Sequence, residues 1–255
     1  MKKRIAALAL FSALSCSIPL FAGGKTETSL TVAAGAGLTD ALNACAALYA
    51  DVEPSVRITP VFGASGSLQA QISQGAPIDV FISASPRFMD ALEKQGLLSP
   101  GTRRNLLANS IVLVVPKDSK GIDSFEDVPA LNHAFIALGE PSSVPVGQYA
   151  EEVLRFYGIL EDAKKKAVYG KDVRQVLSYV ENGDAAAGIV YLTDALSSVK
   201  VRVAAAAPPV SHAPVLFPAA AMQGGPREKE ARAFLDWLSS PEAQAVFASF
   251  GFKEP

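Results

Sequence analysis

The sequence predicts an α/β fold of two lobes, each built on a mixed or largely parallel sheet with flanking helices. The 255 residues suffice for two ordinary domains, and 49% of them are hydrophobic, which supports a buried core. Strand and helix patterns alternate along the chain in two successive series, as is typical of α/β layers. We expect lobe I to comprise residues 23–110 and 214–255, and lobe II to comprise residues 111–213.

The first series contains three apolar strands, and a helical pattern follows each of them. The strands are "SLTVAAGA", "VRITPVFG" and "IDVFISA". The first helix starts at Leu38, where apolar residues recur at helical spacing. The second is short, with Ser65 as its expected N-cap and Gly75 at its end, and the third runs from Pro86 to Gly96.

The second series begins with the apolar strand "NSIVLVVPK" near Ser110. Further strands are "AFIALGEP", "KAVYG", "AAAGIVY", "VRVAAAA" and "PVLFPAAAM". Between them lie a helix over 146–157 and another from Val173, and two last helices open at Pro226 and at Ser240. The chain is expected to return to lobe I before the final strand, near Pro214.

The first residues have the pattern of an export signal. Three basic residues at positions 2–4 precede an apolar run over 5–15, and Ala22 offers a small residue for cleavage. We therefore expect residues 1–22 to be a signal peptide and the mature protein to be exported to the periplasm. Two alternatives are an N-terminal membrane anchor and lipid attachment at Cys16, within "ALSC". In either form of processing Cys45 has no partner, so we expect it to pack in the core of a chain without an internal disulfide.

Charge and motifs together restrict the class of function. Removal of residues 1–22 leaves 20 basic against 25 acidic residues, a net charge of −5 that argues against nucleic acid as a partner. The two histidines, His133 and His212, lie in no metal-ligand spacing. The segment "GASGS" does not meet the spacing of a nucleophile elbow, and no phosphate-binding glycine loop is present. We expect neither an enzyme nor a resident cofactor.

Several predicted strands end in small or hydroxylated residues directly before a helix. These junctions are "AAGAGLTD", "FGASGSL", "EPSSVPVGQ" and "YGKDVRQ". The start of a helix carries unpaired backbone N–H groups and a partial positive charge of about half a unit. If several such starts converge, they can bind an anion without lysine or arginine. The alternative is that these segments are ordinary helix caps.

At these same segments the chain resembles the periplasmic molybdate-binding proteins (ModA type) of ABC uptake systems. The resemblance runs from "LTVAAGAGLTDAL" to "FASFGF" and is strongest in "QISQGAPIDVFISAS", "GEPSSVPVGQYAEEVL" and "KDVRQVLSYVENGDAAAGIVYLTDA". It implies a type II periplasmic binding fold with a two-strand hinge, and one tetrahedral oxyanion, molybdate or tungstate, in the cleft between the lobes. It further implies a monomer that delivers this ligand to an ABC permease in the inner membrane.

The resemblance assigns the oxyanion to hydroxyls and backbone amides. Carried over by position, Ser65 donates its hydroxyl and amide, Val146 and Val173 donate backbone N–H groups, and Tyr191 donates its phenol hydroxyl. Each has a structural alternative: Ser65 as an N-cap, the two valines as core residues, and Tyr191 as a bridge between lobes. Asp172 would repel an anion, so we expect its side chain to cap its own helix.

One position departs from the family pattern. The family carries serine before Leu-Thr in the first motif, whereas this chain has Gly37, which keeps the amide and lacks the hydroxyl. A lost hydrogen bond to a charged group costs about 1.5–3 kcal/mol, or roughly 10- to 100-fold in affinity. This departure leaves open the alternative that the same fold binds another oxyanion or a small organic acid. A third hypothesis is a secreted hydrolase with Ser65 as nucleophile.

Overall fold

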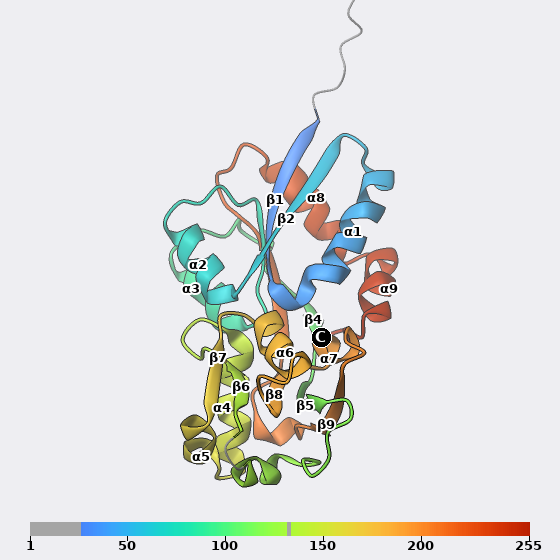
Figure 1. Cartoon of the computed structure of the whole chain (residues 1–255). Helices are drawn as coiled ribbons and strands as arrows, with labels where there is room; N and C mark the ends of the chain where they lie inside the picture. The colour runs from blue at the N-terminus through green and yellow to red at the C-terminus, as the bar shows by residue number, and fades with distance from the viewer. Residues whose placement is uncertain (1–26, 132–133) are drawn as a thin grey trace, which may run out of the picture.

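The chain folds into two α/β lobes stacked end to end, as the sequence predicts (Figure 1). This computed structural model describes residues 27–131 and 134–255. The predicted signal peptide, Cys16 and His133 lie outside the described residues. Within those residues, no helix is both long and apolar enough to cross a membrane.

Lobe I is built on a five-stranded sheet in the order β2-β1-β3-β10-β4. Strand β1 runs parallel to β2 and β3, whereas β10 is antiparallel to β3 and β4. The sheet is therefore mixed, because the last strand arrives from the other lobe. The strands are β1 (Thr28–Gly35), β2 (Val56–Gly63), β3 (Val80–Ile82), β4 (Arg104–Ala108) and β10 (Leu216–Ala221).

Two groups of helices cover the lobe I sheet (Figure 1). Successive residues of β1 face opposite sides, so Val32 packs in the large core and Ala33 packs in a second cluster beneath α2 and α3. Strands buried on both faces need apolar runs of the kind seen here. The helices are η1 (Ala36–Leu38), α1 (Thr39–Val52), α2 (Ser65–Ser73), α3 (Pro86–Lys94), α8 (Glu228–Leu238) and α9 (Pro241–Ser249).

Lobe II repeats this plan with the order β7-β6-β8-β5-β9. Strand β6 is parallel to β7 and β8, and β5 is antiparallel to β8 and β9. The strands are β5 (Ile111–Pro116), β6 (Ile136–Gly139), β7 (Ala167–Gly170), β8 (Ala187–Tyr191) and β9 (Val201–Ala206). The helices are η2 (Phe125–Ala130), α4 (Pro145–Phe156), α5 (Leu160–Lys165), α6 (Val173–Glu181), α7 (Leu192–Leu196) and η3 (Pro209–Ser211).

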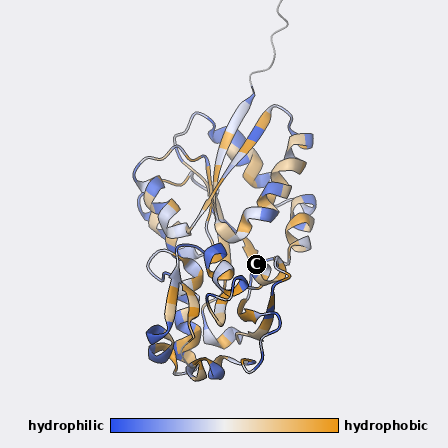
Figure 2. Cartoon of the chain, viewed as in Figure 1, coloured by the Kyte–Doolittle hydropathy of each residue, from blue (hydrophilic) through white to orange (hydrophobic). Residues whose placement is uncertain are grey.

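The chain crosses between the sheets twice. It passes from β4 to β5 through Asn109 and Ser110, and it returns from β9 to β10 through residues 207–215. Apolar residues concentrate on the strands and the inner sides of the helices, as Figure 2 shows. The largest core cluster contains residues of both lobes, including Ile111, Tyr191 and Phe217. The lobes therefore meet through side chains as well as through the two connections.

Several local features differ from the sequence prediction. Ser65 is the first residue of α2 rather than its N-cap, and Ala64 takes the cap position without a side-chain hydrogen bond. Strand β4 and the short helices α5 and α7 do not appear in the sequence prediction. Strand β4 reads "RNLLA", with polar residues at its start, and it is stabilised by pairing with β10, more than a hundred residues away in sequence.

Candidate functional site

The carboxyl ends of strands from both lobes meet at a small cavity. This is where parallel α/β sheets collect ligands, because strand ends and helix starts adjoin there. The cavity has a volume of about 10 Å³, enough for roughly one water molecule. Its walls are Gly35, Ala36, Gly37, Gly63, Ala64, Ser65, Ala84, Val144, Pro145, Val146, Asp172, Val173 and Tyr191.

All five residues that the sequence singled out line this cavity. Gly37 and Ser65 come from lobe I, and Val146, Val173 and Tyr191 come from lobe II. Five segments separated by up to 154 positions in the sequence therefore converge on one point. The structure does not scatter them, which is the arrangement that a site shared between lobes requires.

Two hydroxyls of the cavity are organised by a single residue, Ala84, which follows β3. The Ala84 N–H donates to Ser65 Oγ at 2.9 Å, and Tyr191 Oη donates to the Ala84 carbonyl at 3.2 Å. Because Ser65 accepts from Ala84, its own O–H remains free to donate into the cavity. Tyr191 would have to release Ala84 before it could donate to a ligand.

Backbone amides at helix starts supply the other donors. Val173 is the first residue of α6, Val146 is the second residue of α4, and Gly37 lies in η1 directly before α1. The first four N–H groups of a helix have no partner within it, so these amides are available to a ligand. The starts of α2, α4 and α6 also carry partial positive charge toward the cavity.

The electrostatics of the cavity depend on neutral groups. No lysine or arginine is among its walls in the part of the chain that the structure describes. The one carboxylate among these walls, Asp172, turns to its own helix and accepts from the Gln175 N–H at 2.9 Å, as expected for a cap. Burial raises the pKa of Tyr191 well above its ordinary value, which keeps the phenol protonated and able to donate. The site is thus a set of uncharged donors.

Among the described residues there is no group of three or more potential metal-binding side chains. Ser65 Oγ contacts a backbone amide rather than a base, and the His212 ring pairs with the Ala213 carbonyl at 2.7 Å. The Cys45 thiol is free and buried in the core of lobe I, as its spacing predicts.

Three further residues near the cavity did not emerge from the sequence. Ala84 organises both hydroxyls through its backbone, which no side-chain pattern reveals. Arg174 and Asp194 lie behind Gly37: an ideal Cβ at position 37 would be 3.2 and 3.3 Å from the two Asp194 carboxylate oxygens. A signal was present in "KDVRQ" and "YLTDA", since both charged residues sit in the first turn of a helix beside a predicted site residue.

A two-lobed α/β protein with a small cavity between its lobes, lined by backbone amides and two hydroxyls, belongs to the class of ligand-capturing binding proteins. The comparisons narrow this class to one family. Residues 30–253 match the model of the bacterial extracellular solute-binding proteins, and the chain belongs to that family. The family binds solutes, and the fold agrees with the type II binding-protein architecture expected from the sequence.

Similar proteins are spread across several bacteria. YvgL of Bacillus subtilis, described as a putative ABC transporter substrate-binding lipoprotein, is 41% identical over 229 residues, which cover 89% of this chain and 87% of YvgL. The molybdate-binding protein ModA of Haemophilus influenzae is 37% identical over 230 residues, covering 89% and 90%. The structure of the Azotobacter vinelandii periplasmic molybdate-binding protein superimposes with a TM-score of 0.80 at 26% identity, covering 89% of this chain and 99% of that one.

Proposed function

We propose that this protein is the solute-binding component of an ABC importer and that it captures molybdate, or the equivalent tungstate, in the cavity between its lobes. The observation that carries the proposal is the convergence of three helix starts and two neutral hydroxyls on one cavity. Among the described residues, no lysine or arginine lines this cavity. The molybdate-binding relatives support the same ligand. Gly37, Val146 and Val173 donate backbone N–H groups, and Ser65 and Tyr191 donate hydroxyls.

The donor set explains selectivity for a fully deprotonated dianion. Each oxygen of molybdate can accept hydrogen bonds, so every donor is satisfied. Monohydrogen phosphate brings an O–H that must compete for acceptors already engaged in this structure: Asp172 Oδ1 accepts from the Gln175 N–H, and the Ala84 carbonyl accepts from Tyr191 Oη. A buried unpaired O–H costs about 1–3 kcal/mol, or roughly 5- to 150-fold in affinity. The protein therefore discriminates against phosphate by hydrogen bonding rather than by charge.

Ligand capture requires movement, because the cavity of about 10 Å³ is too small for a tetrahedral oxyanion. The lobes open for entry, and Tyr191 exchanges the Ala84 carbonyl for an oxygen of the anion. On closure the anion is bonded from both sides and shifts the population toward the closed form. The closed form is the one that the permease in the inner membrane recognises.

The same proposal covers location and assembly. The mature chain acts outside the cytoplasmic membrane as a monomer, after export directed by residues 1–22, with lipid attachment at Cys16 as the alternative form of processing. It has no catalytic role and no resident cofactor. Another oxyanion or a small organic acid stays the alternative ligand. The hydrolase alternative gains no support from the geometry, because the partner of Ser65 Oγ among the described residues is the Ala84 amide rather than a base.

Calorimetry with molybdate, tungstate, sulfate and phosphate tests the proposal. We expect one molybdate per chain, matched by tungstate, with phosphate at least about fivefold weaker. Tyr191→Phe should weaken molybdate binding, whereas Tyr169→Phe, on an exposed part of β7, should not. Ser65→Ala and the exposed Ser67→Ala, two residues along α2, form a second matched pair. Phosphate binding as tight as molybdate would contradict the donor-only site.

A further inference from the structure

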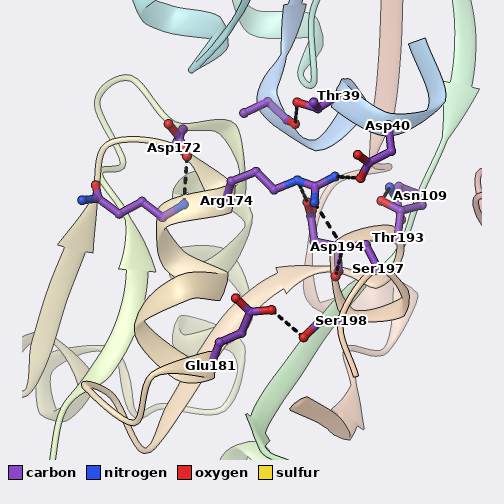
Figure 3. Close-up of polar contacts among 12 residues, drawn as sticks. Thr39, Asp40, Asn109, Asp172, Arg174, Glu181, Thr193, Asp194, Ser197 and Ser198 are labelled. Atoms are coloured by element: carbon purple, nitrogen blue, oxygen red, sulfur yellow. Dashed lines mark hydrogen bonds and ion pairs between the residues drawn. The ribbon is translucent and has the colours of Figure 1, made fainter. Parts of the chain in front are cut away.

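Arg174 lies directly behind the anion cavity without reaching into it. It is the second residue of α6 and follows Val173, whose amide is a proposed ligand. Its guanidinium has three partners (Figure 3): Nη2 is 2.6 Å from Asp40 Oδ2, Nη1 is 3.2 Å from Ser197 Oγ, and Nε is 3.4 Å from Asp194 Oδ1. The charge of Arg174 is therefore paired outside the cavity.

These contacts join the two lobes. Asp40 is in the first turn of α1 in lobe I, whereas Arg174, Ser197 and Asp194 belong to lobe II. Within the described parts of the chain, Arg174–Asp40 is the only ion pair that crosses from one lobe to the other, and the remaining pairs stay inside a lobe. Opening of the cleft must separate this pair.

Asp194 holds Arg174 in place on the lobe II side. Its side chain is completely buried, and neither carboxylate oxygen has a hydrogen-bond partner of acceptable geometry among the described residues. Among the described residues, Arg174 is the cationic side chain that pairs with the Asp194 carboxylate. If Arg174 turned toward a bound anion, it would leave a buried carboxylate without its cation, which is costly. Arg174 therefore keeps its place beside Asp194 and does not bind the anion.

The same contacts set the distance between two proposed donor segments. Val173 Cγ1 would lie 3.5 Å from a Cβ placed on Gly37, so the start of α6 rests against η1. Arg174 adjoins Val173 in sequence, and Asp40 follows Gly37 by three residues. An ion pair between these neighbours aligns the Val173 and Gly37 amides across the cleft.

We propose that Arg174 is a positioning residue for the anion site, which through Asp40 holds lobe II against lobe I and slows release of the ligand. This inference rests on the proposed oxyanion-binding function. The pair is partly exposed, with 31% of the Arg174 and 49% of the Asp40 side chain accessible. Exposed pairs of this kind contribute up to about 1 kcal/mol, so its loss should accelerate dissociation by up to about fivefold.

The test compares Asp40→Asn, Arg174→Gln and the double variant by stopped-flow dissociation of molybdate and by small-angle scattering. We expect Asp40→Asn to raise the dissociation rate constant by about two- to fivefold and to lose the dependence of that rate on ionic strength. The double variant should release molybdate no faster than Arg174→Gln alone. The matched control is the Arg202–Asp123 pair, which lies wholly within lobe II; its removal by Asp123→Asn should leave release unchanged.

Arg174→Gln can destabilise the fold, because it leaves the buried Asp194 carboxylate without its cation. A second variant therefore combines Arg174→Gln with Asp194→Asn. It removes both charges and should show the same faster release. Unchanged release in Asp40→Asn, when the wild type binds molybdate, would overturn the positioning role and leave the proposed function intact. A wild-type chain that binds none of the four anions would overturn both.

Discussion

The two lobes approach each other closely at Gly66. A single methyl group added there should weaken ligand binding without lowering the stability of the fold. Gly66 is the second residue of α2 in lobe I, and its N–H donates to the Ser143 carbonyl of lobe II at 2.9 Å. An ideal Cβ on Gly66 would lie 2.7 Å from Ser143 O and 2.8 Å from Ser143 Cα. Both atoms are backbone, so only movement of one lobe relieves the overlap.

The magnitude follows from two opposed effects. In the open form, alanine in place of glycine favours helix α2 by up to about 1 kcal/mol. In the closed form, the overlap costs about 1–3 kcal/mol and the distorted hydrogen bond about 1 kcal/mol more. A penalty of roughly 2–4 kcal/mol on closure corresponds to an affinity loss of roughly 30- to 700-fold. The Phe88 ring, whose Cε1 is also 2.8 Å away, belongs to lobe I and can turn aside.

The assay combines calorimetry with scattering on Gly66→Ala. We expect a melting temperature without ligand that equals or exceeds that of the wild type, weakened molybdate binding, and little compaction on adding molybdate. Gly225→Ala is the control, because a Cβ there meets only Asp79 Oδ1 at 3.9 Å within lobe I. If Gly66→Ala bound molybdate with wild-type affinity and compacted fully, the close approach of α2 to Ser143 would not be part of the bound state.

Three further predictions concern single groups. Burial raises the pKa of Asp194 from 3.8 to about 7, with Arg174 opposing the shift, so the folded state holds this proton more tightly than the unfolded state. The free energy of unfolding that this group contributes is present at low pH and is lost as pH rises from about 4 to about 7, by up to about 4 kcal/mol. Urea unfolding at several pH values should show that Asp194→Asn lacks this loss. Parallel plots of unfolding free energy against pH for the two proteins would contradict it. Gly37→Ala should weaken molybdate binding because its Cβ crowds the Asp194 carboxylate. Gly37→Ser should bind more tightly than Gly37→Ala, because its hydroxyl can donate to the Asp194 carboxylate and offset this crowding; calorimetry would contradict this if serine were the weaker. Burial raises the pKa of Cys45 to about 12, so in a Cys16→Ser chain a thiol reagent should label Cys45 only after unfolding, and rapid labelling of the native chain would show that its pocket is open.

Local patterns carried most of the fold prediction. Apolar runs such as that of β5 and the helical spacing of Val173, Val176 and Val180 depend only on neighbouring residues, and both appear in the structure as expected. Strand β4 depends on pairing with β10, which lies far along the chain, so its own five residues were not sufficient. The antiparallel strands that make each sheet mixed likewise reflect the chain returning between lobes.

The candidate site likewise has one part that the sequence predicts and another that only the structure shows. Its walls at Val146 and Val173 follow from helix starts that the sequence displays, and the structure brings them to one cavity with Ser65 and Tyr191. Ser65 nonetheless has a different local role from the expected cap, because its hydroxyl is drawn to the Ala84 amide of another segment. Contacts of this kind are decided by three-dimensional proximity, and no short motif encodes them.

The central claim is that a doubly charged oxyanion is held by amides and hydroxyls from both lobes, with no cationic side chain against it. A crystal structure of the molybdate complex, with anomalous scattering from molybdenum, tests this most directly. We expect one molybdenum peak in the cavity, with anion oxygens accepting from Ser65, Tyr191 and the amides of Gly37, Val146 and Val173. A peak placed elsewhere, or an arginine or lysine side chain bonded to the anion, would contradict it.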